Sequence, residues 1–363
     1  MLENWLECID PKLNTHCLEG TIGNTIQINY NGIDKLDDVQ IAIISDKHPS
    51  NNHWRKEWYS LFNHFSKLKI ADLGSLRKNN NECLIPVLKD LLTGGIFPIV
   101  IAQDESLSES LFVAYNSFGQ WLKLLIIDEK IRMSDEKDKK NYVNKLLQEK
   151  IRNFIIPSIL GYQIHFTPPQ NLEFIHYFFL EHIRLGQIIP NLEITEPIIR
   201  DADMMLFHLS SIKSSEAPGV HHPTPNGFTG IEACQLCRYA GFSDKLSLAG
   251  IVGLNPKNDP EHQTSHLIAQ MIWYILDGFY HRLNEFPVSI KGLQAYLVDH
   301  KSNDVSLTFW KSKLSGRWWI QIPGVEFSEK DRHALIPCLH NDYVMATNGE
   351  LSDKLFMLLH RLN

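Results

Sequence analysis

Cysteine, basic charge and long apolar runs are all scarce in this chain, and each scarcity excludes a class of protein. The 363 residues include only six cysteines, so we expect free thiols rather than the disulfide framework of a small secreted domain. The formal net charge is -7, and no basic run is long enough to indicate nucleic-acid binding. No apolar run reaches the roughly 18 residues of a membrane span, and the first residues do not resemble a signal peptide. We therefore expect a cytoplasmic protein with no nucleic-acid or membrane partner.

Two local patterns that could carry chemistry have simpler interpretations. Cys234 and Cys237 have C-x-x-C spacing, but segment 232–239 predicts a helix. No second cysteine pair or histidine pair lies at zinc-finger spacing. We interpret both thiols as packing residues, with metal or redox chemistry as the alternative. The charged run at 134–140 mixes both signs and predicts a solvated loop or the start of a helix.

Short apolar runs alternate with longer amphipathic stretches along most of the chain. Runs as apolar as these favour strands of a parallel sheet that is covered on both faces. Capping boxes that begin at Ser106 and Thr229 indicate helix starts. This alternation predicts an α/β protein with three α/β/α layers and a mainly parallel sheet. The predicted strands are 39–45, 98–102, 124–128, 162–166, 204–209 and 246–252, and the predicted helical stretches lie within 54–65, 107–122 and 264–282.

The character of the sequence changes beyond about residue 284. Segments 305–310 and 317–322 look like strands joined through a Ser-Gly turn, and a short final helix is predicted after them. We predict one α/β domain over residues 1–285 and a small appended subdomain over 286–363. The consecutive Trp318 and Trp319 point to opposite faces of a strand. Either both pack in a core, or one packs and the other serves an interface.

Polar residues follow three of the predicted strands at the point where each strand ends. They are Gln103-Asp-Glu-Ser106, Asp128-Glu-Lys-Ile-Arg132 and His208-x-Ser210. In an open parallel sheet, ligands bind outside the carboxyl ends of the strands. Because these three loops share one edge, we expect their side chains to converge there.

The chain resembles the ureohydrolase superfamily of arginase, agmatinase and formimidoylglutamase, and it is most similar to the formimidoylglutamase branch. This resemblance implies an arginase-like fold, a frequent tendency to form homo-oligomers, and hydrolysis of guanidino or formimino C–N bonds by a hydroxide that bridges two Mn²⁺ ions. The segments that carry the resemblance are 98–108, 124–133, 200–203 through 217–219, 225–228, 255–256 and 264–269.

The first two metal-ligand motifs of the family are altered in this chain. The first normally reads Gly-Gly-Asp-His-Ser with the histidine on the metal, and Glu105 takes the place of that histidine. The second normally reads Asp-Ala-His-x-Asp. Here Asp128 is retained, but Lys130 replaces the histidine and Arg132 replaces the second aspartate.

The third motif is altered as well. It normally supplies two aspartates two residues apart, and His208 and Ser210 stand there; the glutamate that usually holds the substrate amidine falls at Gly253. Two metal ions need several donors to offset about four positive charges, whereas this set has lost carboxylates and gained two cations. We therefore expect the manganese site to be lost, with no metal cofactor and with side-chain cations paired to Glu105 and Asp128. The alternative is one divalent ion on Glu105, Asp128 and His208.

These changes predict a protein with a formimidoylglutamase-like fold that is non-catalytic and acts as a binding or scaffold protein. Asp104, Lys213, Asn226 and Gly253 are further pocket candidates beside the former metal-site positions. The exchange of acids for bases favours a small carboxylate ligand, with an amidine as the other possibility. Two further classes stay open. One is an active hydrolase of linear amidines with a relocated or single metal, and the other is a protein-interaction module acting through 286–363.

Overall fold

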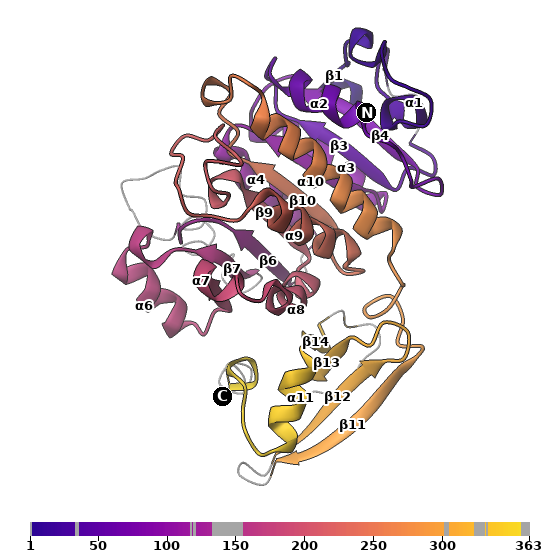
Figure 1. Cartoon of the computed structure of the whole chain (residues 1–363). Coiled ribbons are helices and arrows are strands. Elements are labelled where there is room, and N and C mark those ends of the chain that lie inside the picture. The colour runs from indigo at the N-terminus through magenta and orange to yellow at the C-terminus, as the bar shows by residue number, and fades with distance from the viewer. Residues whose placement is uncertain are drawn as a thin grey trace.

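The computed structural model describes residues 2–32, 36–116, 118, 121–132, 155–300, 305–322, 331 and 333–356, so the charged run at 134–140 lies outside the described residues. The chain forms a large α/β body followed by a small antiparallel sheet (Figure 1). The strands of the body are β1 (Leu6–Glu7), β2 (Gln27–Ile28), β3 (Ile41–Ser45), β4 (Ile70–Leu76), β5 (Phe97–Ala102), β6 (Leu122–Ile127), β7 (Ile155–Tyr162), β8 (His182–Arg184), β9 (Met204–His208) and β10 (Leu248–Val252). Its helices are α1 (Ile22–Thr25), α2 (Asn51–Ser60), α3 (Asn81–Thr93), α4 (Ser108–Asn116), α6 (Pro169–Tyr177), α7 (Leu185–Ile188), α8 (Glu196–Asp201), α9 (Gly230–Phe242) and α10 (Gln263–Tyr280).

The central sheet has ten strands in the described residues. Nine of them follow the order β1-β4-β3-β5-β10-β9-β6-β7-β8, and β2 pairs with β4. Every described pairing in this sheet is parallel except that of β1 with β4. The predicted α/β class with a mainly parallel sheet is therefore confirmed.

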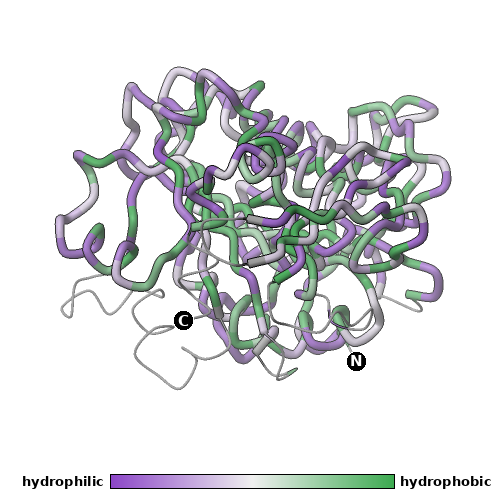
Figure 2. Tube along the Cα trace, turned by 90° about the horizontal axis from the view of Figure 1, so that it is seen from below, coloured by the Kyte–Doolittle hydropathy of each residue, from purple (hydrophilic) through white to green (hydrophobic). Residues whose placement is uncertain are grey.

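Alternate residues of the central strands enter two separate cores, one on each face of the sheet. In β3, Ile41 and Ile43 join the core formed with α2, α9 and α10, whereas Ala42 and Ile44 join the core formed with α3 and α4. Figure 2 shows hydrophobic residues recurring along the central segments of the body, with hydrophilic residues frequent in the outer loops. Burial on both faces is why these strands read as continuous apolar runs.

Cys234 and Cys237 lie on α9 and belong to the core that α9 shares with α2 and α10. Burial raises the pKa of the Cys234 thiol to about 12, so this thiol stays protonated at neutral pH. This placement agrees with the packing interpretation of the pair. Among the described residues, no helix combines the length and the hydropathy needed to cross a bilayer.

The chain beyond α10 forms the second sheet, in the order β11-β12-β13-β14, and each described pairing in it is antiparallel. Trp318 and Trp319 point to opposite faces of β13 and are 6% and 1% exposed, so both pack inside the molecule. The elements are β11 (Leu293–His300), β12 (Val305–Ser312), β13 (Trp318–Gln321), β14 (Leu335–Cys338) and α11 (His340–Thr347). The domain boundary after residue 285 stays a prediction.

Arg200, on α8, connects the body with the second sheet. Its guanidinium carbon lies 4.4 Å from the centroid of the Trp319 ring, and its Nη2 donates to the carbonyl of Trp318 at 3.2 Å. Its Nε pairs with Glu196 at 2.8 Å. The side chain is only 4% exposed, so it depends on these partners for the hydrogen bonds that water would otherwise supply.

Two predicted elements differ from the structure in type or extent. The strand predicted at 162–166 is wrong: β7 ends at Tyr162, and Ile164–Phe166 is a 3₁₀ turn in which the Phe166 N–H donates to the Gln163 carbonyl. The helical stretch within 54–65 ends at Ser60, because Leu61 has extended dihedral angles.

Two further predictions fail near α4, and one strand was not predicted. The helical stretch within 107–122 ends at Asn116, and Leu122 begins β6. No capping box forms at Ser106, since the Asp104 carboxylate accepts the Ser106 N–H and a 3₁₀ turn precedes α4. The capping box at Thr229 is present. Strand β4 escaped prediction because Asp72 and Gly74 interrupt its apolar run.

Helices α9 and α10 approach each other at two glycines. A Cβ atom added at Gly241 would lie 2.1 Å from the carbonyl oxygen of Ile275, and one added at Gly278 would lie 2.2 Å from that of Arg238. Both obstacles are backbone atoms, which cannot rotate away. The two helices therefore need glycine at these positions to pack at their observed separation.

We expect Gly278→Ala to lower the free energy of unfolding by about 1–3 kcal/mol or more, as overpacking of a well-packed contact does. Urea denaturation monitored by circular dichroism measures the change. Gly186→Ala in α7 is the matched control, because nothing lies within 4 Å of its added Cβ, and it should be neutral or stabilising by up to about 1 kcal/mol. Equal effects of the two substitutions would contradict the packing argument.

Candidate functional site

A polar cleft of about 980 Å³ opens at the carboxyl edge of the central sheet. Loops that follow five parallel strands contribute to its walls: β3, β5, β6, β9 and β10. They supply Asp46, residues 103–106, residues 129–132, Ser210 and residues 253–257. Convergence of these loops is the geometry expected where parallel strands end together.

Arg132 lies at the centre of the cleft and joins residues from three of these loops. Its Nε donates to Asp128 Oδ2 and its Nη1 donates to Glu105 Oε2, both at 2.5 Å. Its Nη2 lies 3.4 Å from Asp128 Oδ1 and 3.4 Å from the Ser210 hydroxyl, which itself donates to Asp128 Oδ1 at 3.3 Å. One guanidinium therefore bridges two carboxylates, as the exchange of charges in the sequence predicts.

Asp128 and His208 lie beneath this arginine, and both are fully buried. Burial alone would raise the pKa of Asp128, but the charge and hydrogen bond of Arg132, together with His208 and Lys130, lower it below the ordinary value. Burial lowers the pKa of His208, so the imidazole is neutral at neutral pH. Its Nε2 is 3.9 Å from Asp128 Oδ2. Glu105, Asp128, Arg132, His208 and Ser210 thus form one compact cluster at the base of the cleft.

The other sequence candidates are divided between the cleft and its surroundings. Lys130 lines the cleft and forms no ion pair with a described residue. Asp104 lines it too, with one carboxylate oxygen accepting the Ser106 N–H at 2.9 Å. Gly253 has φ +94, and a Cβ there would lie 3.3 Å from Glu105 Oε1. A side chain at this position would be both strained and close to the carboxylate.

Two predicted pocket residues lie away from the cleft. The described lining includes neither Lys213 nor Asn226. The Lys213 Nζ lies 3.4 Å from Glu216 on the same loop. The Asn226 backbone carbonyl accepts a hydrogen bond from Gln163 at 3.4 Å. Both residues contact partners outside the cleft. Their sequence positions gave no indication of these contacts. His221 and His222 line the mouth of the cleft and are exposed.

Glu129 is a cleft residue that the sequence reasoning did not identify. It is 5% exposed, and its Oε2 has no hydrogen-bond partner among the described residues. Burial, followed by the negative charge of Asp128, raises its pKa to about 7. One feature of the sequence could have identified Glu129 as a cleft residue. It directly follows Asp128 at the end of an apolar strand. At neutral pH this carboxyl exchanges a proton readily and can act as donor or acceptor.

This arrangement does not fit a pair of Mn²⁺ ions. The Arg132 guanidinium keeps its charge at any accessible pH, and it contacts the carboxylates of both Asp128 and Glu105. A second cation, Lys130, lies on the same loop. Within the described part of the chain, no group of three His, Cys, Asp or Glu side chains is arranged to hold a metal ion. The positive charge that carboxylates normally meet in a metal site is here carried by a side chain.

The protein has a mainly parallel sheet between helical layers and a polar cleft at the carboxyl edge of that sheet. It therefore belongs to the class of open α/β proteins that bind ligands at this edge. The chain matches the arginase family over residues 45–277 and belongs to that family. It is 29% identical over 105 residues to a formimidoylglutamase of Staphylococcus aureus strain MRSA252, a stretch covering 28% of this chain and 33% of that enzyme. The match thus spans about a third of the relative's length.

Solved structures of arginase-like proteins share the fold at low identity. The formiminoglutamase of Trypanosoma cruzi with Mn²⁺ has a TM-score of 0.60 and 18% identity, covering 69% of this chain and 97% of that chain. The formimidoylglutamase of Bacillus subtilis has a TM-score of 0.61 and 16% identity, covering 69% and 90%. An agmatine ureohydrolase of Thermoplasma volcanium has a TM-score of 0.55 and 15% identity, covering 75% and 98%.

Glu129 should make the stability of the folded protein depend on pH. Its pKa is about 7 in the folded state against an ordinary value of 4.5, so folded protein binds this proton more tightly than unfolded protein does. The resulting stabilisation is present below pH 4.5 and is lost as pH rises through 7. Glu129→Gln should remove this loss, which amounts to about 3 kcal/mol by linkage.

The measurement is urea denaturation of both proteins between pH 4.5 and 8. Glu82→Gln, on the exposed first turn of α3, controls for the removal of one carboxylate. The difference between Glu129→Gln and the unsubstituted chain should grow with pH, while Glu82→Gln should show no such trend. Parallel curves for Glu129→Gln and the unsubstituted chain would contradict the assignment.

Proposed function

We propose that this arginase-family protein binds a small carboxylate in the cleft and does not carry out manganese-dependent hydrolysis. The observation that carries the proposal is the position of the Arg132 guanidinium, within 2.5 Å of both Asp128 and Glu105. The carboxylates that a metal centre would use are already paired with an arginine. Because the matched stretch covers a third of the curated relative, the activity named for that relative is not carried over to this chain.

Electrostatics gives the physical reason for the loss of metal binding. A divalent ion entering the cluster would meet the charges of Arg132 and Lys130, and at a few ångströms each repulsion amounts to several kcal/mol at an effective dielectric constant of about 20. Moving Arg132 aside would leave the fully buried Asp128 carboxylate without its main partner. Uncompensated charges of this kind are strongly destabilising. Both costs oppose metal binding.

Two lysines of the cleft wall support an anionic ligand. Lys130 and Lys257 line the cleft, and neither forms an ion pair with a described residue. A protonated Glu129 would add a hydrogen-bond donor near pH 7 or below. An amidine ligand is itself cationic and would be repelled by both lysines. A small carboxylate such as a glutamate derivative therefore suits this wall better.

Metal content is the first prediction of this proposal. After incubation with Mn²⁺ and dialysis, the purified protein should retain less than about 0.1 equivalent of metal by elemental analysis. A variant with Glu105→His, Lys130→His, Arg132→Asp, His208→Asp and Ser210→Asp restores the family ligands and should gain metal, provided that circular dichroism shows it folded. One or two ions on the unsubstituted chain, together with Mn²⁺-stimulated hydrolysis of a formimino or guanidino substrate, would overturn the proposal.

Ligand binding is the second prediction. Calorimetric titration with N-formimino-L-glutamate and with L-glutamate should show binding that Lys130→Ala weakens by roughly tenfold, the value of one charge-assisted contact of about 1.4 kcal/mol. Lys213→Ala is the matched control, since Lys213 lies outside the cleft lining, and it should leave affinity unchanged. Agmatine, an amidine-like cation, should not bind. If the double variant Lys130→Ala, Lys257→Ala bound the ligand with unchanged affinity, the proposal that these two lysines bind the carboxylate would be wrong.

A further inference from the structure

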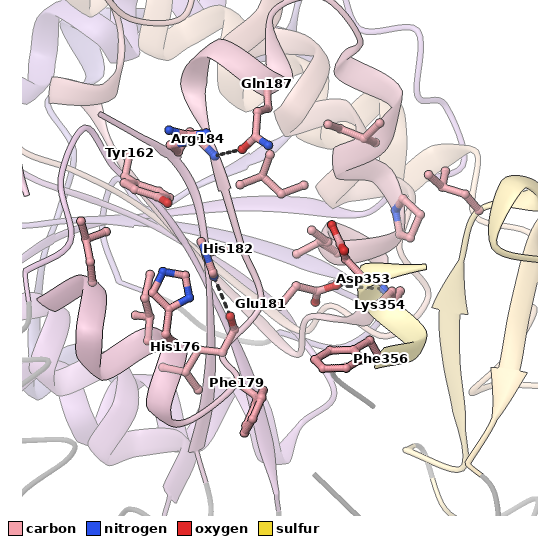
Figure 3. A pocket seen from close by; sticks show the side chains of 18 of the residues that line it. Tyr162, His176, Phe179, Glu181, His182, Arg184, Gln187, Asp353, Lys354 and Phe356 are labelled. Atoms are coloured by element: carbon pink, nitrogen blue, oxygen red, sulfur yellow. Dashed lines mark hydrogen bonds and ion pairs between the residues drawn. The ribbon is translucent and has the colours of Figure 1, made fainter. Parts of the chain in front are cut away.

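A second pocket lies where the body meets the C-terminal part of the chain, and it shares no described lining residue with the carboxyl-edge cleft. Its volume is about 840 Å³, within the range of small-molecule sites. The body supplies walls from β7, α6, β8 and α8, and the C-terminal part supplies Leu339, Asp342 and residues 353–356. Figure 3 shows side chains from both parts facing the same space.

Hydrogen-bond donors gather at one end of this pocket. Arg184 and Gln187 lie at an exposed edge, and Arg184 forms no ion pair with a described residue. The Gln187 amide oxygen accepts the Arg184 backbone N–H at 3.3 Å, which leaves its amide NH₂ group to donate. Figure 3 places Tyr162 beside them. Tyr162 is 3% exposed overall, and its hydroxyl forms no hydrogen bond with a described residue.

The interior of the pocket is largely apolar, and two charged residues on its C-terminal side, Lys354 and Asp342, already have partners. Ile175, Leu180 and Ile198 are buried in its wall, and Phe356 closes it from the C-terminal side. The Lys354 Nζ lies 3.0 Å from Glu181. Asp342 accepts the Leu339 N–H at the start of α11. Lys354 and Asp342 therefore have local partners, unlike Arg184, and the third charged residue on this side, Asp353, is exposed.

His182, one of two histidines in the pocket lining, does not add a cation. Burial lowers the pKa of His182, so its ring is neutral at neutral pH. Its Nδ1 lies 2.8 Å from the Leu180 carbonyl oxygen, which fixes the proton on Nδ1 as a donor. Tyr162 and His182 pack with ring centroids 5.9 Å apart. The two rings form an uncharged wall between the donor end and the apolar interior.

We infer that this pocket binds a small amphiphilic carboxylate, with its anionic head at Arg184, Gln187 and Tyr162 and its apolar body in the interior. Three donors with one net positive charge match a carboxylate, which accepts up to four hydrogen bonds. A cationic head would be repelled by Arg184, and a neutral head would leave that charge unpaired. This inference does not rest on the function proposed for the carboxyl-edge cleft.

The ligand would also contact both parts of the chain at once. Ile198 belongs to α8 of the body, whereas Phe356 lies beyond α11. An apolar chain placed between them removes surface of both parts from water, and burial of each CH₂ group is worth about 0.8 kcal/mol. Binding should therefore raise the melting temperature of the whole protein.

The test is calorimetric titration of the full-length chain with octanoate, octan-1-ol and octylammonium, which share one tail and differ in head charge. Octanoate should bind at a 1:1 ratio and octylammonium should not. Arg184→Gln should weaken octanoate binding at least tenfold and leave octanol binding unchanged, and Tyr162→Phe should weaken octanoate binding severalfold. Phe356→Ala should weaken octanoate and octanol alike, because it removes a wall and no charge.

Three results would overturn the inference. One is the absence of saturable octanoate binding to the full-length chain. Another is equal binding of octanoate and octylammonium, which would indicate an apolar surface without head-group recognition. The third is octanoate binding that Lys257→Gln weakens and Arg184→Gln does not, since this would place the carboxylate in the carboxyl-edge cleft. Arg184 is exposed, so loss of folding is not expected to mask its substitution.

Discussion

Burial of the central sheet on both faces is the constraint on which the rest of this structure depends. Because β3, β5, β9 and β10 alternate between two apolar cores, polar side chains are largely confined to strand ends or to tightly partnered positions. Asp72 in β4 shows the second case: Arg55 and Tyr59 donate hydrogen bonds to it. The carboxyl ends of the strands collect the remaining polar groups, and the cleft forms where five of the following loops meet.

This constraint explains how much the sequence could predict. Continuous apolar runs that end in polar clusters identified β5, β6 and β9 and the convergence of Glu105, Asp128 and Arg132, because that signal is local. Strand β4 escaped because Asp72 breaks its run, and the side chains that pair with this carboxylate, Arg55 and Tyr59, belong to another element. Glu129 escaped for a related reason, since its raised pKa depends on burial by other segments. Lys213 pairs with Glu216 on its own loop instead of lining the cleft. The sequence around Lys213 is compatible with either arrangement, so it could not predict which one forms.

In this chain the arginase-family scaffold surrounds a cluster in which one arginine pairs with two carboxylates. Asp128 and Glu105 supply negative charge, Arg132 supplies positive charge, and His208 is neutral. Within this cluster Arg132 and Ser210 donate hydrogen bonds to Asp128, whereas Lys130 and Lys257 line the cleft. The proposed change of function therefore concerns the charges at the ends of the strands.

Arg200 has a consequence for how the molecule unfolds. Its guanidinium stacks on Trp319, donates to the Trp318 carbonyl and pairs with Glu196 of its own helix. If the second sheet detached, a buried cation would lose its aromatic and carbonyl partners together, and Trp319 would be exposed to water. Local opening at this junction is therefore costly, and the two sheets belong to one cooperative unit whose amide protons should exchange with solvent on a common timescale.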